Sequence, residues 1–499
     1  MEYILTGREM AEFDNYTIEH IGIPSLVLME NASRAMADVI YKNHKDKRIL
    51  VIAGTGNNGA DGLCICRILR TRGVDCRYRI IGNPEKATEQ FQTQKEILDR
   101  LGYSQESAEQ FWDNSWAEVV VDALFGVGLS RNITGKYAQA IEEINNMKAY
   151  KYAVDIPSGV HADDGHICAV AVKADCTVTF GFKKAGCILY PGKAYCGRLI
   201  KTEIGYAEEL CKEKGYARSC SEEDLCSVPK RAEDGNKGSF GKILILAGSQ
   251  EYAGAAVLAA SAAYSMGAGM VKVVTHRENK EILYAHIPEV LGLFYEDVRE
   301  DGFSDAFQKS IAWADSIVAG PGMAQSISSE LLLDELLECA GDKKMVLDAD
   351  ALNLLAKSSW RKEKLDSHMV ITPHVVEMAR LCGEEPEQIK QNPGKISMDF
   401  AKKYHCTVVL KDAVTTVSDG RELYYNQSGN SGMASAGSGD VLAGMLGASL
   451  VWGMPVSKTA AITAYIHGKA GDYAAEKYGR KAVTAGKLTD SLSFLKKYE

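Results

Sequence analysis

Proline is scarce in this sequence and acidic residues outnumber basic ones, whereas glycine is abundant. Of 499 residues, 11 are proline and 46 are glycine, a balance that favours tight turns between strands and helices over flexible linkers. The formal net charge is −9, so the chain as a whole has no electrostatic reason to bind nucleic acid or an anionic membrane, and we expect neither as a partner. Any phosphate group of a ligand must be held locally, by backbone amides or a few cations.

Paired cysteines are also missing. None of the thirteen cysteines belongs to a CxxC motif, so the spacing of a cysteine-based metal site is not present. We expect reduced thiols, mostly in the core of a cytoplasmic protein, because charges such as Glu2 and Arg8 exclude a secretory signal. Residues 252–271 are twenty uncharged positions rich in Ala, Gly and Ser, a composition that predicts a closely packed buried helix and not a membrane span.

Two blocks of alternating strand and helix patterns are separated by a charged, aperiodic stretch over residues 208–234. The first block opens with helical patterning at 4–16 and 26–41. The expected strands are 48–53, 78–81, 118–121, 150–154 and 176–180 in the first block, and 242–247, 271–275, 316–319, 345–347, 369–371, 407–410, 415–417 and 422–425 in the second. Helices are expected in the second block at 254–266, 328–339, 440–451 and 457–477. We therefore predict an α/β fold in two domains, 1–217 and 226–499, each a mainly parallel sheet with helices on both faces.

The first glycine-rich turn lies between an apolar run and a helical segment. Gly54, Gly56 and Gly59 match the G-x-G-x-x-G pattern of dinucleotide-binding turns. An ordinary NAD-dependent dehydrogenase also has an acidic residue at the end of the next strand, but here Asp75 precedes that strand, which argues against this class. The glycines still allow backbone amides and a helix N-terminus to approach a phosphate.

Side chains with oxygen atoms gather around this turn. Asn57, Asn58 and Asp61 lie in or just after it, while Asp122 and Asp155 follow two further predicted strands. Ligands of parallel sheets bind at the carboxyl ends of the strands, so we expect Asn58, Asp122 and Asp155 to converge there. The alternative is that the two aspartates only cap helices or turns.

The second glycine-rich turn precedes a strong helical pattern in the sequence GNSGMASAGSGDVLAGMLGASL. Asp440 stands at the start of that helix, where it is either a simple helix cap or a general base. The glycines before it leave amides open to an anion, and a base beside an anion site is what phosphoryl transfer to a hydroxyl requires. Neither G-x-x-x-x-G-K-[ST] nor G-x-S-x-G occurs, which excludes the P-loop class and the nucleophile elbow.

The first block closely resembles the NAD(P)HX epimerase domain, over about residues 1–215, through LMENASRAMA, GTGNNGADGL, VDALFGVGL, VDIPSGVHADDG and KADCTVTFGFKKAG. The resemblance implies a Rossmann-like three-layer α/β/α fold, Asp155 as the acid/base carboxylate, and a potassium ion on Asn58, Asp122 and Ser158. The residues implied to line the hydrated nucleotide are Asn57, Asn58, Gly59, Ala60, Asp61, Gly126, Val127, Gly128, Leu129, Ser130, Arg131, Asn132 and Asp155. Ala60 stands where the family usually has glycine, and we expect its methyl group to narrow the loop slightly.

The second block, over about residues 230–495, resembles the ribokinase-like superfamily and more narrowly the ADP/ATP-dependent NAD(P)HX dehydratase domain. The matching segments are NKGSFGKILILAGSQEYAGAA, AAYSMGAGMVKVVT, IPEV, VAGPGMA, VLDADALN, TPHVVEMARL and VVLKDAVTTV. Carried over by position, Ala255, Gly322 and His374 contact the hydrated nucleotide and Asp440 is the base on its C6 hydroxyl. The nucleotide site implied in the same way consists of Lys411, Asp412, Ala413, Val414, Thr415 and Gly439, with Mg²⁺ offsetting the charge of ADP or ATP.

The second block departs from its family pattern more often than the first. Asp412 replaces a glycine beside the phosphates, and we expect its side chain to point to solvent. Ala324 replaces a glycine of the substrate loop, and Ser431, Ser435 and Ala436 replace Pro, Thr and Gly. His374 taken alone is more typical of a structural histidine, and only its TPH context favours a role at the site.

The sequence therefore predicts a bifunctional metabolite-repair enzyme, an isomerase joined to a lyase, that acts on NADHX and NADPHX. The first domain interconverts the R and S hydrates, and the second dehydrates the S form with ADP or ATP and releases AMP or ADP and phosphate. Resemblance to fused bacterial-type enzymes favours ADP, and we expect a homo-oligomer. Two alternatives stay open: a ribokinase-like kinase for a small alcohol or vitamin precursor, and a first domain that only binds a nucleotide or a partner.

Overall fold

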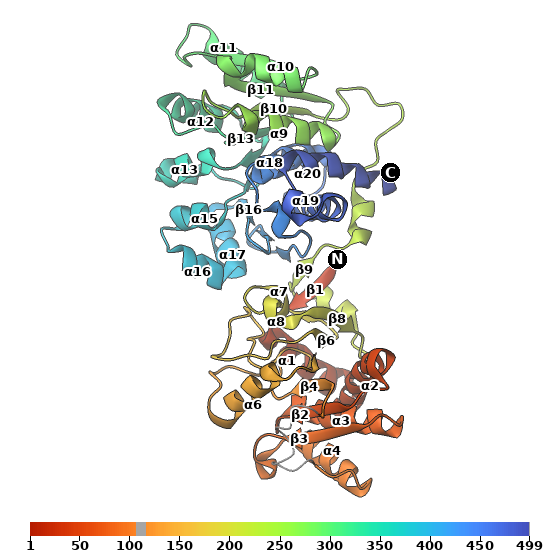
Figure 1. The fold of residues 1–499 in the computed structure, drawn as a ribbon. Coiled ribbons are helices and arrows are strands. Elements are labelled where there is room, and N and C mark those ends of the chain that lie inside the picture. The colour runs from red at the N-terminus through yellow and green to blue at the C-terminus, as the bar shows by residue number, and fades with distance from the viewer. Residues whose placement is uncertain (106–115, 499) are drawn as a thin grey trace. The chain divides into compact units, whose positions relative to one another are not determined.

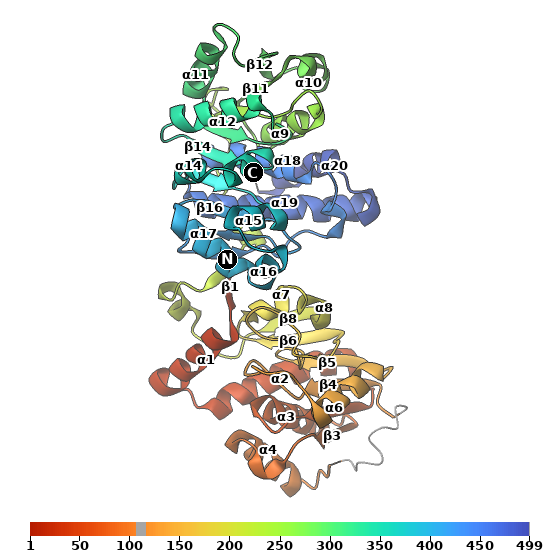
Figure 2. The same ribbon diagram turned by 90° about the vertical axis from the view of Figure 1, so that its left-hand side faces the viewer.

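The chain folds into two units, each built around its own sheet (Figures 1 and 2). The computed structural model describes residues 1–105 and 116–498. Tyr3–Tyr216 form the N-terminal unit, and Met1–Glu2 with Ala217–Glu499 form the C-terminal unit. In the described part of the chain, no helix combines the length and the apolar character needed to cross a bilayer.

The N-terminal unit has a parallel sheet with the strand order β3-β2-β4-β5-β6-β8, and a short parallel pair of β1 and β7. Its elements are β1 (Glu2–Leu5), α1 (Gly7–Tyr16), α2 (Ser25–His44), β2 (Ile49–Ala53), α3 (Asn57–Thr71), β3 (Cys76–Ile80), α4 (Glu89–Arg100), β4 (Val119–Ala123), α6 (Gly135–Asn146), β5 (Tyr150–Val154), β6 (Cys176–Phe180), β7 (Lys183–Lys184), α7 (Ala185–Ile188), α8 (Lys193–Cys196) and β8 (Arg198–Thr202).

Alternating side chains of the central strands build two cores, one on each face of this sheet. Val51 and Ala53 of β2 pack against α2 and α3, whereas Leu50 and Ile52 pack against α6. Every residue of β2 and β4 is buried, as expected for parallel strands covered on both faces. The three-layer α/β/α arrangement predicted from the sequence is confirmed.

The start of the first helix differs from the prediction. Helical patterning begins at residue 4, but Ile4 and Leu5 belong to β1 and α1 begins only at Gly7. The reason is a capping box: the Glu9 amide donates to Thr6 Oγ1 over 3.2 Å, and the Thr6 amide donates to Glu9 Oε2 over 2.8 Å. This reciprocal pair fixes the helix start and leaves the preceding residues extended.

The C-terminal unit has a larger sheet with the order β12-β11-β10-β13-β14-β15-β16-β17-β18-β9, parallel from β12 to β16 and antiparallel at β17. Its elements are β9 (Ala217–Ser219), β10 (Lys242–Leu246), α9 (Ala253–Ser265), β11 (Met270–His276), α10 (Lys280–His286), β12 (Leu291–Tyr295), α11 (Phe303–Trp313), β13 (Ser316–Ala319), α12 (Ile327–Cys339), β14 (Lys344–Leu347), α13 (Asp350–Ala356), α14 (Ser359–Glu363), β15 (Met369–Ile371), α15 (Val375–Cys382), α16 (Pro386–Gln391), α17 (Pro393–Tyr404), β16 (Thr407–Leu410), β17 (Thr416–Ser418), β18 (Leu423–Tyr425), α18 (Ser438–Ser449), α19 (Val456–Tyr478) and α20 (Ala485–Ser491).

The alanine-rich segment forms α9, the buried helix that its composition predicts. It shares one core with α18 and α19, while α11, α12, α13, α15 and α17 contribute to the core on the opposite face of the sheet. Small residues let α9 and α18 approach closely: a Cβ atom added at Gly444 would lie 2.0 Å from the carbonyl oxygen of Ala259. All thirteen cysteines are free thiols, and all but Cys226, Cys339 and Cys382 are buried.

Besides β1 and the two-residue strand β7, three strands escaped the sequence analysis. β8 and β12 are edge strands of their sheets and carry few buried residues, so they lack an apolar run. β9 lies inside the stretch expected to be an aperiodic linker. Its Arg218 pairs with Tyr424 of β18 and makes an ion pair with Glu422 over 3.1 Å. This stretch therefore contributes a strand to the sheet and is not only a linker.

We predict that Gly59→Ala destabilises the N-terminal unit, whereas Gly56→Ala leaves its stability nearly unchanged. A Cβ atom at residue 59 would lie 1.9 Å from the carbonyl oxygen of Gly54, but one at residue 56 meets nothing within 4 Å. Overpacking of this kind costs about 1–3 kcal/mol. Chemical denaturation of both variants measures the difference, and equal unfolding midpoints would contradict the packing argument.

Candidate functional site

A cavity of about 880 Å³ opens at the carboxyl ends of the strands of the N-terminal unit. Of the residues predicted to bind the hydrated nucleotide, it is lined by Asn57, Asn58, Asp61, Gly126, Val127, Gly128, Leu129, Ser130, Arg131 and Asp155. Gly59, Ala60 and Asn132 are not among its described lining residues. The methyl group of Ala60 is fully buried in the core between α3 and the sheet, so it does not narrow the loop as expected.

The N-terminus of α3 faces this cavity through Asn57 and Asn58. β2 ends at Ala53, the turn runs through Gly54 and Gly56, and the helix begins at Asn57 without a side-chain cap at its N-cap residue, Gly56. The first amides of a helix lack partners within the helix, so those of α3 are placed to bind an anion. This is the strand–turn–helix arrangement that the glycine pattern predicts.

Asp155 follows β5 in a left-handed conformation, with a φ of 67° that non-glycine residues rarely adopt. One of its oxygens accepts hydrogen bonds from the Phe180 amide over 3.0 Å and from Thr179 Oγ1 over 3.1 Å. The same oxygen forms an ion pair with Lys184. Asp155 is therefore held by the neighbouring strand β6 and by a cation, with its side chain in the cavity wall.

Lys184 is a site residue that the sequence analysis missed. Its side chain is only 1% exposed, and Nζ donates to Asp155, to Thr179 Oγ1 over 3.2 Å and to the Phe180 carbonyl over 3.0 Å. The signal was present in the sequence, because Lys184 lies in GFKKAG just after the end of β6. A lysine in an otherwise buried segment needs an anionic partner, which a strand-end aspartate provides.

Two more carboxylates, Asp14 and Asp61, line the same cavity. Burial and the nearby charges of Asp155 and Asp14 hold the pKa of Asp61 well above its ordinary value. Burial also raises the pKa of Asp14, although a hydrogen bond from the Tyr206 hydroxyl acts in the opposite direction. The positive charge of Lys184 opposes the upward shift of both pKa values. This one lysine therefore compensates part of the charge of Asp14 and Asp61 as well as that of its ion-pair partner Asp155.

Asp122 and Ser158 form a fully buried pair and are not among the described residues that line the cavity. Asp122 Oδ1 accepts from Ser158 Oγ over 2.6 Å, and Oδ2 accepts from the Ser158 amide over 2.8 Å. Burial raises the pKa of Asp122 to about 6 in spite of these hydrogen bonds. Asn58 is buried nearby against Gly126, and its side-chain amide nitrogen has no hydrogen-bond partner in the described part of the chain.

In the C-terminal unit, Asp440 is the third residue of α18. The N-cap is Gly437, with a φ of 88°, so Asp440 is not the cap that the alternative interpretation required. Burial, together with the charge of Asp348, raises the pKa of Asp440 to about 6, while the charge of Lys411 acts against this shift. A carboxylate with this pKa accepts a proton readily near neutral pH.

Lys411 directly follows β16, and its side chain extends toward the first turn of α18. Its Nζ donates to Asp348 Oδ1 over 2.6 Å, and Thr372 Oγ1 donates to the same oxygen over 2.7 Å. A Cβ atom added at Gly439 would lie 3.3 Å from this Nζ, so the glycine keeps room beside the cation. Asp348 follows β14 and is 1% exposed. It was missed as a site residue although the motif VLDADALN contains it.

The remaining predicted residues of this unit are placed as follows. Gly322 and Ala255 are neighbours, since a Cβ atom at residue 322 would lie 2.8 Å from the Ala255 methyl group. His374 Nδ1 accepts from the amides of Val376 and Glu377 and caps α15, the structural role that its residue type alone indicates.

In the nucleotide segment, Asp412 and Ala413 are exposed, Thr415 is half-buried and Val414 packs inward with 4% exposure. The exposure of Asp412 agrees with the expectation that its side chain points to solvent. Ala324 adopts a left-handed φ of 60°, the conformation that the family's glycine accommodates more easily.

Family comparisons assign each unit. Residues 243–493 match the family model described as NAD(P)H-hydrate dehydratase, and residues 25–186 match the one described as YjeF-related protein N-terminus. The bifunctional NAD(P)H-hydrate repair enzyme Nnr of Moorella thermoacetica is 34% identical, with 99% of this chain and 96% of the relative covered. The enzyme of the same name from Thermofilum pendens is 33% identical, with 97% and 94% covered.

Solved structures resemble the C-terminal half of the chain. A ribokinase-like superfamily protein from Enterococcus faecalis matches with a TM-score of 0.51 and 27% identity, over 56% of this chain and 96% of that one. The ADP/ATP-dependent NAD(P)H-hydrate dehydratase from Bacillus subtilis, co-crystallised with ATP and Mg²⁺, matches with a TM-score of 0.50 and 25% identity, over 57% and 99%. With the full-length relatives above 30% identity, these matches show that the chain belongs to the family of bifunctional NAD(P)H-hydrate repair enzymes.

Proposed function

We propose that this chain restores NADH and NADPH from their hydrates. The N-terminal unit epimerises NADHX and NADPHX, and the C-terminal unit dehydrates the S form with ADP or ATP. The observation that carries the proposal is the position and the pKa of Asp440. This carboxylate lies in the first turn of α18, after a glycine-rich turn, and its pKa is raised although the charge of Lys411 acts against the shift. We also propose that the chain works in the cytoplasm as a homo-oligomer.

The epimerase step needs a group that moves a proton near the hydrated C6 carbon while positive charge develops on the ring. Asp155 in the cavity wall supplies such a carboxylate, and its negative charge also stabilises the developing cation. Lys184 and the Phe180 amide hold Asp155 in one orientation through a single oxygen. The anion-binding N-terminus of α3 is placed in the same cavity to hold a phosphate of the nucleotide.

The oxygen atoms of Asn58, Asp122 and Ser158 fit a potassium ion. In the described part of the chain, the fully buried carboxylate of Asp122 accepts hydrogen bonds from neutral donors of Ser158 and Leu124, so a bound cation would balance its charge. The oxygen of the Asn58 side chain would lie 3.3 Å from a Cβ atom added at Gly126. Asn58, Asp122 and Ser158 all offer oxygen ligands, the type that an alkali cation prefers. We propose that Asn58, Asp122 and Ser158 hold K⁺, which supplies fixed positive charge beside the bound nucleotide.

The dehydratase step begins when Asp440 removes the proton of the C6 hydroxyl, whose oxygen then attacks the terminal phosphoryl group of ADP or ATP. The P–O bond to the nucleotide breaks and AMP or ADP leaves. Phosphate is a far better leaving group than hydroxide. It leaves C6 with the electrons of the C–O bond, and loss of a proton from the neighbouring C5 to solvent then restores the ring double bond. The first amides of α18 and Lys411 are placed to stabilise the charge of the transferring group, and Mg²⁺ would accompany the nucleotide.

The direct test incubates the full chain with a mixture of NADHX epimers and either ADP or ATP, and follows the absorbance of restored NADH. We expect complete restoration that depends on the nucleotide and is faster with ADP. Nucleotide consumption driven by a small alcohol, with no NADH restored, would support the kinase alternative instead.

We predict that Asp440→Asn abolishes dehydration and leaves epimerisation intact, because an amide cannot accept the hydroxyl proton. Loss of a general base typically lowers the rate by about 10²–10⁴-fold. In the parent chain, kcat/KM for dehydration should fall as the pH drops through about 6, where Asp440 becomes protonated. Dehydratase turnover of the variant within tenfold of the parent would refute the assignment.

We predict that K⁺ raises the thermal stability of the N-terminal unit and the epimerase rate, relative to tetramethylammonium, in the parent but not in Asp122→Ala. The variant lacks the one carboxylate of the proposed ligand set, so the difference between the two cations should vanish. Melting temperatures and initial rates in matched chloride salts measure this difference. Identical behaviour of the parent in both salts would show that no such potassium site exists.

We predict that Lys184→Met destabilises the N-terminal unit more at pH 8 than at pH 5. Without the lysine, the pKa values of Asp14 and Asp61 rise further above those of the unfolded chain. The folded state then binds protons more tightly than the unfolded state, so stability falls as the pH rises. Melting temperatures at both pH values, with the exposed Lys173→Met as control, measure the effect; an equal loss at both would contradict the charge argument.

A further inference from the structure

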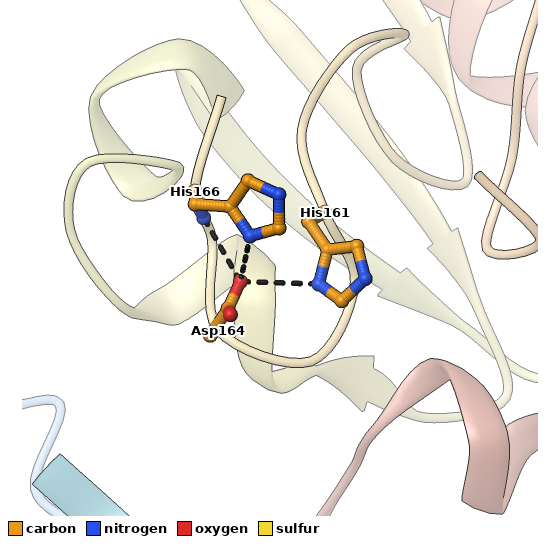
Figure 3. A group of neighbouring side chains, drawn as sticks. All are labelled: His161, Asp164 and His166. Atoms are coloured by element: carbon orange, nitrogen blue, oxygen red, sulfur yellow. Dashed lines mark hydrogen bonds and ion pairs between the residues drawn. The ribbon is translucent and has the colours of Figure 1, made fainter. Parts of the chain in front are cut away.

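Two histidines and an aspartate meet in the hairpin that follows Ser158, outside the sites described above. His161 Nδ1 lies 3.1 Å from Asp164 Oδ1, and His166 Nδ1 lies 2.7 Å from the same oxygen. Figure 3 shows both imidazole rings turned toward this carboxylate. The rings stack with their centroids 4.4 Å apart, so three ligand-type atoms converge on one small volume.

The hairpin backbone holds this group in place. Val160 and Ile167 form an antiparallel bridge, and the His161 amide donates to the His166 carbonyl over 2.9 Å. The His166 amide donates to Asp164 Oδ1 over 3.1 Å, which fixes the carboxylate between the two rings. A ligand set on a preformed turn loses less conformational entropy on binding than one on a free loop.

The distances suit a transition-metal ion. A tetrahedral zinc site has bonds of about 2.0–2.2 Å, which separate its ligand atoms by roughly 3.3–3.6 Å. The three ligand atoms here all lie within 4.8 Å of one another. The side chains of His161, Asp164 and His166 are 21%, 23% and 53% exposed, so an ion can reach them from solvent.

We propose that His161, Asp164 and His166 form a binding site for a divalent transition-metal ion, with Zn²⁺ as the best fit and water completing the shell. Imidazole ligands favour zinc and its neighbours in the first transition row over Mg²⁺, Ca²⁺ or K⁺. The expectation from the sequence concerned only cysteine-based transition-metal sites, whereas this ligand set consists of histidine and aspartate. The proposal is independent of the repair reaction.

The bound ion would stabilise the hairpin and the start of α1 together. Asp163, next to the cluster, accepts a hydrogen bond from the Gly7 amide over 2.6 Å. Gly7 also packs tightly on the hairpin, since a Cβ atom added there would lie 2.9 Å from the Ala162 methyl group. Asp14 of the same helix lines the cavity of the N-terminal unit, so α1 would link the bound ion to one wall of that cavity.

The test is a zinc titration of the metal-free full chain in competition with a chromophoric chelator. The variants are His166→Gln, which changes the most exposed ligand, and the double variant with His161→Gln; the control is His286→Gln, an exposed histidine of α10. We expect one zinc ion to bind to the parent and the control. The affinity should fall at least tenfold in the single variant and at least a hundredfold in the double variant.

Thermal unfolding of the same proteins gives a second readout. Zinc should raise the melting temperature of the N-terminal unit in the parent and in His286→Gln, but not in the double variant. Circular dichroism without metal should be the same for all of them, which shows that the substitutions leave the fold intact. Equal zinc affinity in the parent and the double variant, or no zinc binding to the parent, would overturn the proposal.

Discussion

Both sites depend on the same physical constraint: carboxylates withdrawn from water that share a single lysine. In the N-terminal unit the pair is Asp155 and Lys184, and in the C-terminal unit it is Asp348 and Lys411. Burial of a charge is costly unless it is paired and hydrogen-bonded, so each lysine is fixed by its partner. Because one lysine cannot neutralise the charge of several carboxylates, the others keep a raised pKa. Burial and the charge of Asp348 raise the pKa of Asp440 to about 6 in this way.

The parallel sheets explain why these charges meet. Asp155, Asp348 and Lys411 each follow a parallel strand, and Asp122 is the last residue but one of β4. The carboxyl ends of such strands lie at one edge of the sheet. Helix N-termini open toward the same edge and add partial positive charge where a phosphate binds. In each unit the same backbone arrangement places a helix N-terminus and a carboxylate at this edge of the sheet, and these are the anion site and the proton-transfer group that we propose. The two units differ in the side chains at these positions.

Much of this was predictable from local sequence. Apolar runs in the sequence predict the central strands. Asp155 and Asp440 lie next to glycine-containing turns, which are also recognisable in the sequence. Lys184 and Asp348 were missed because their roles come from contacts that the fold creates, such as the ion pair of Lys411 with a residue 63 positions away. The His161 cluster is local in sequence, but the side-chain orientations that bring its atoms together are visible only in the structure. The edge strand β12 was not predicted, and the methyl group of Ala60 was expected at the loop although it is buried in the core. In both cases the sequence of one segment does not show which other segments pack against it.

The central claim is that two centres on one chain act in series on the two hydrates. It is tested most directly with purified R-NADHX and ADP, by comparing the parent with Asp155→Asn, which keeps the shape of the side chain but removes its charge. The account predicts that the parent restores NADH rapidly, that the variant does so only at the rate of uncatalysed epimerisation, and that both convert S-NADHX equally fast. Equal rates of the parent and the variant on the R form would contradict it.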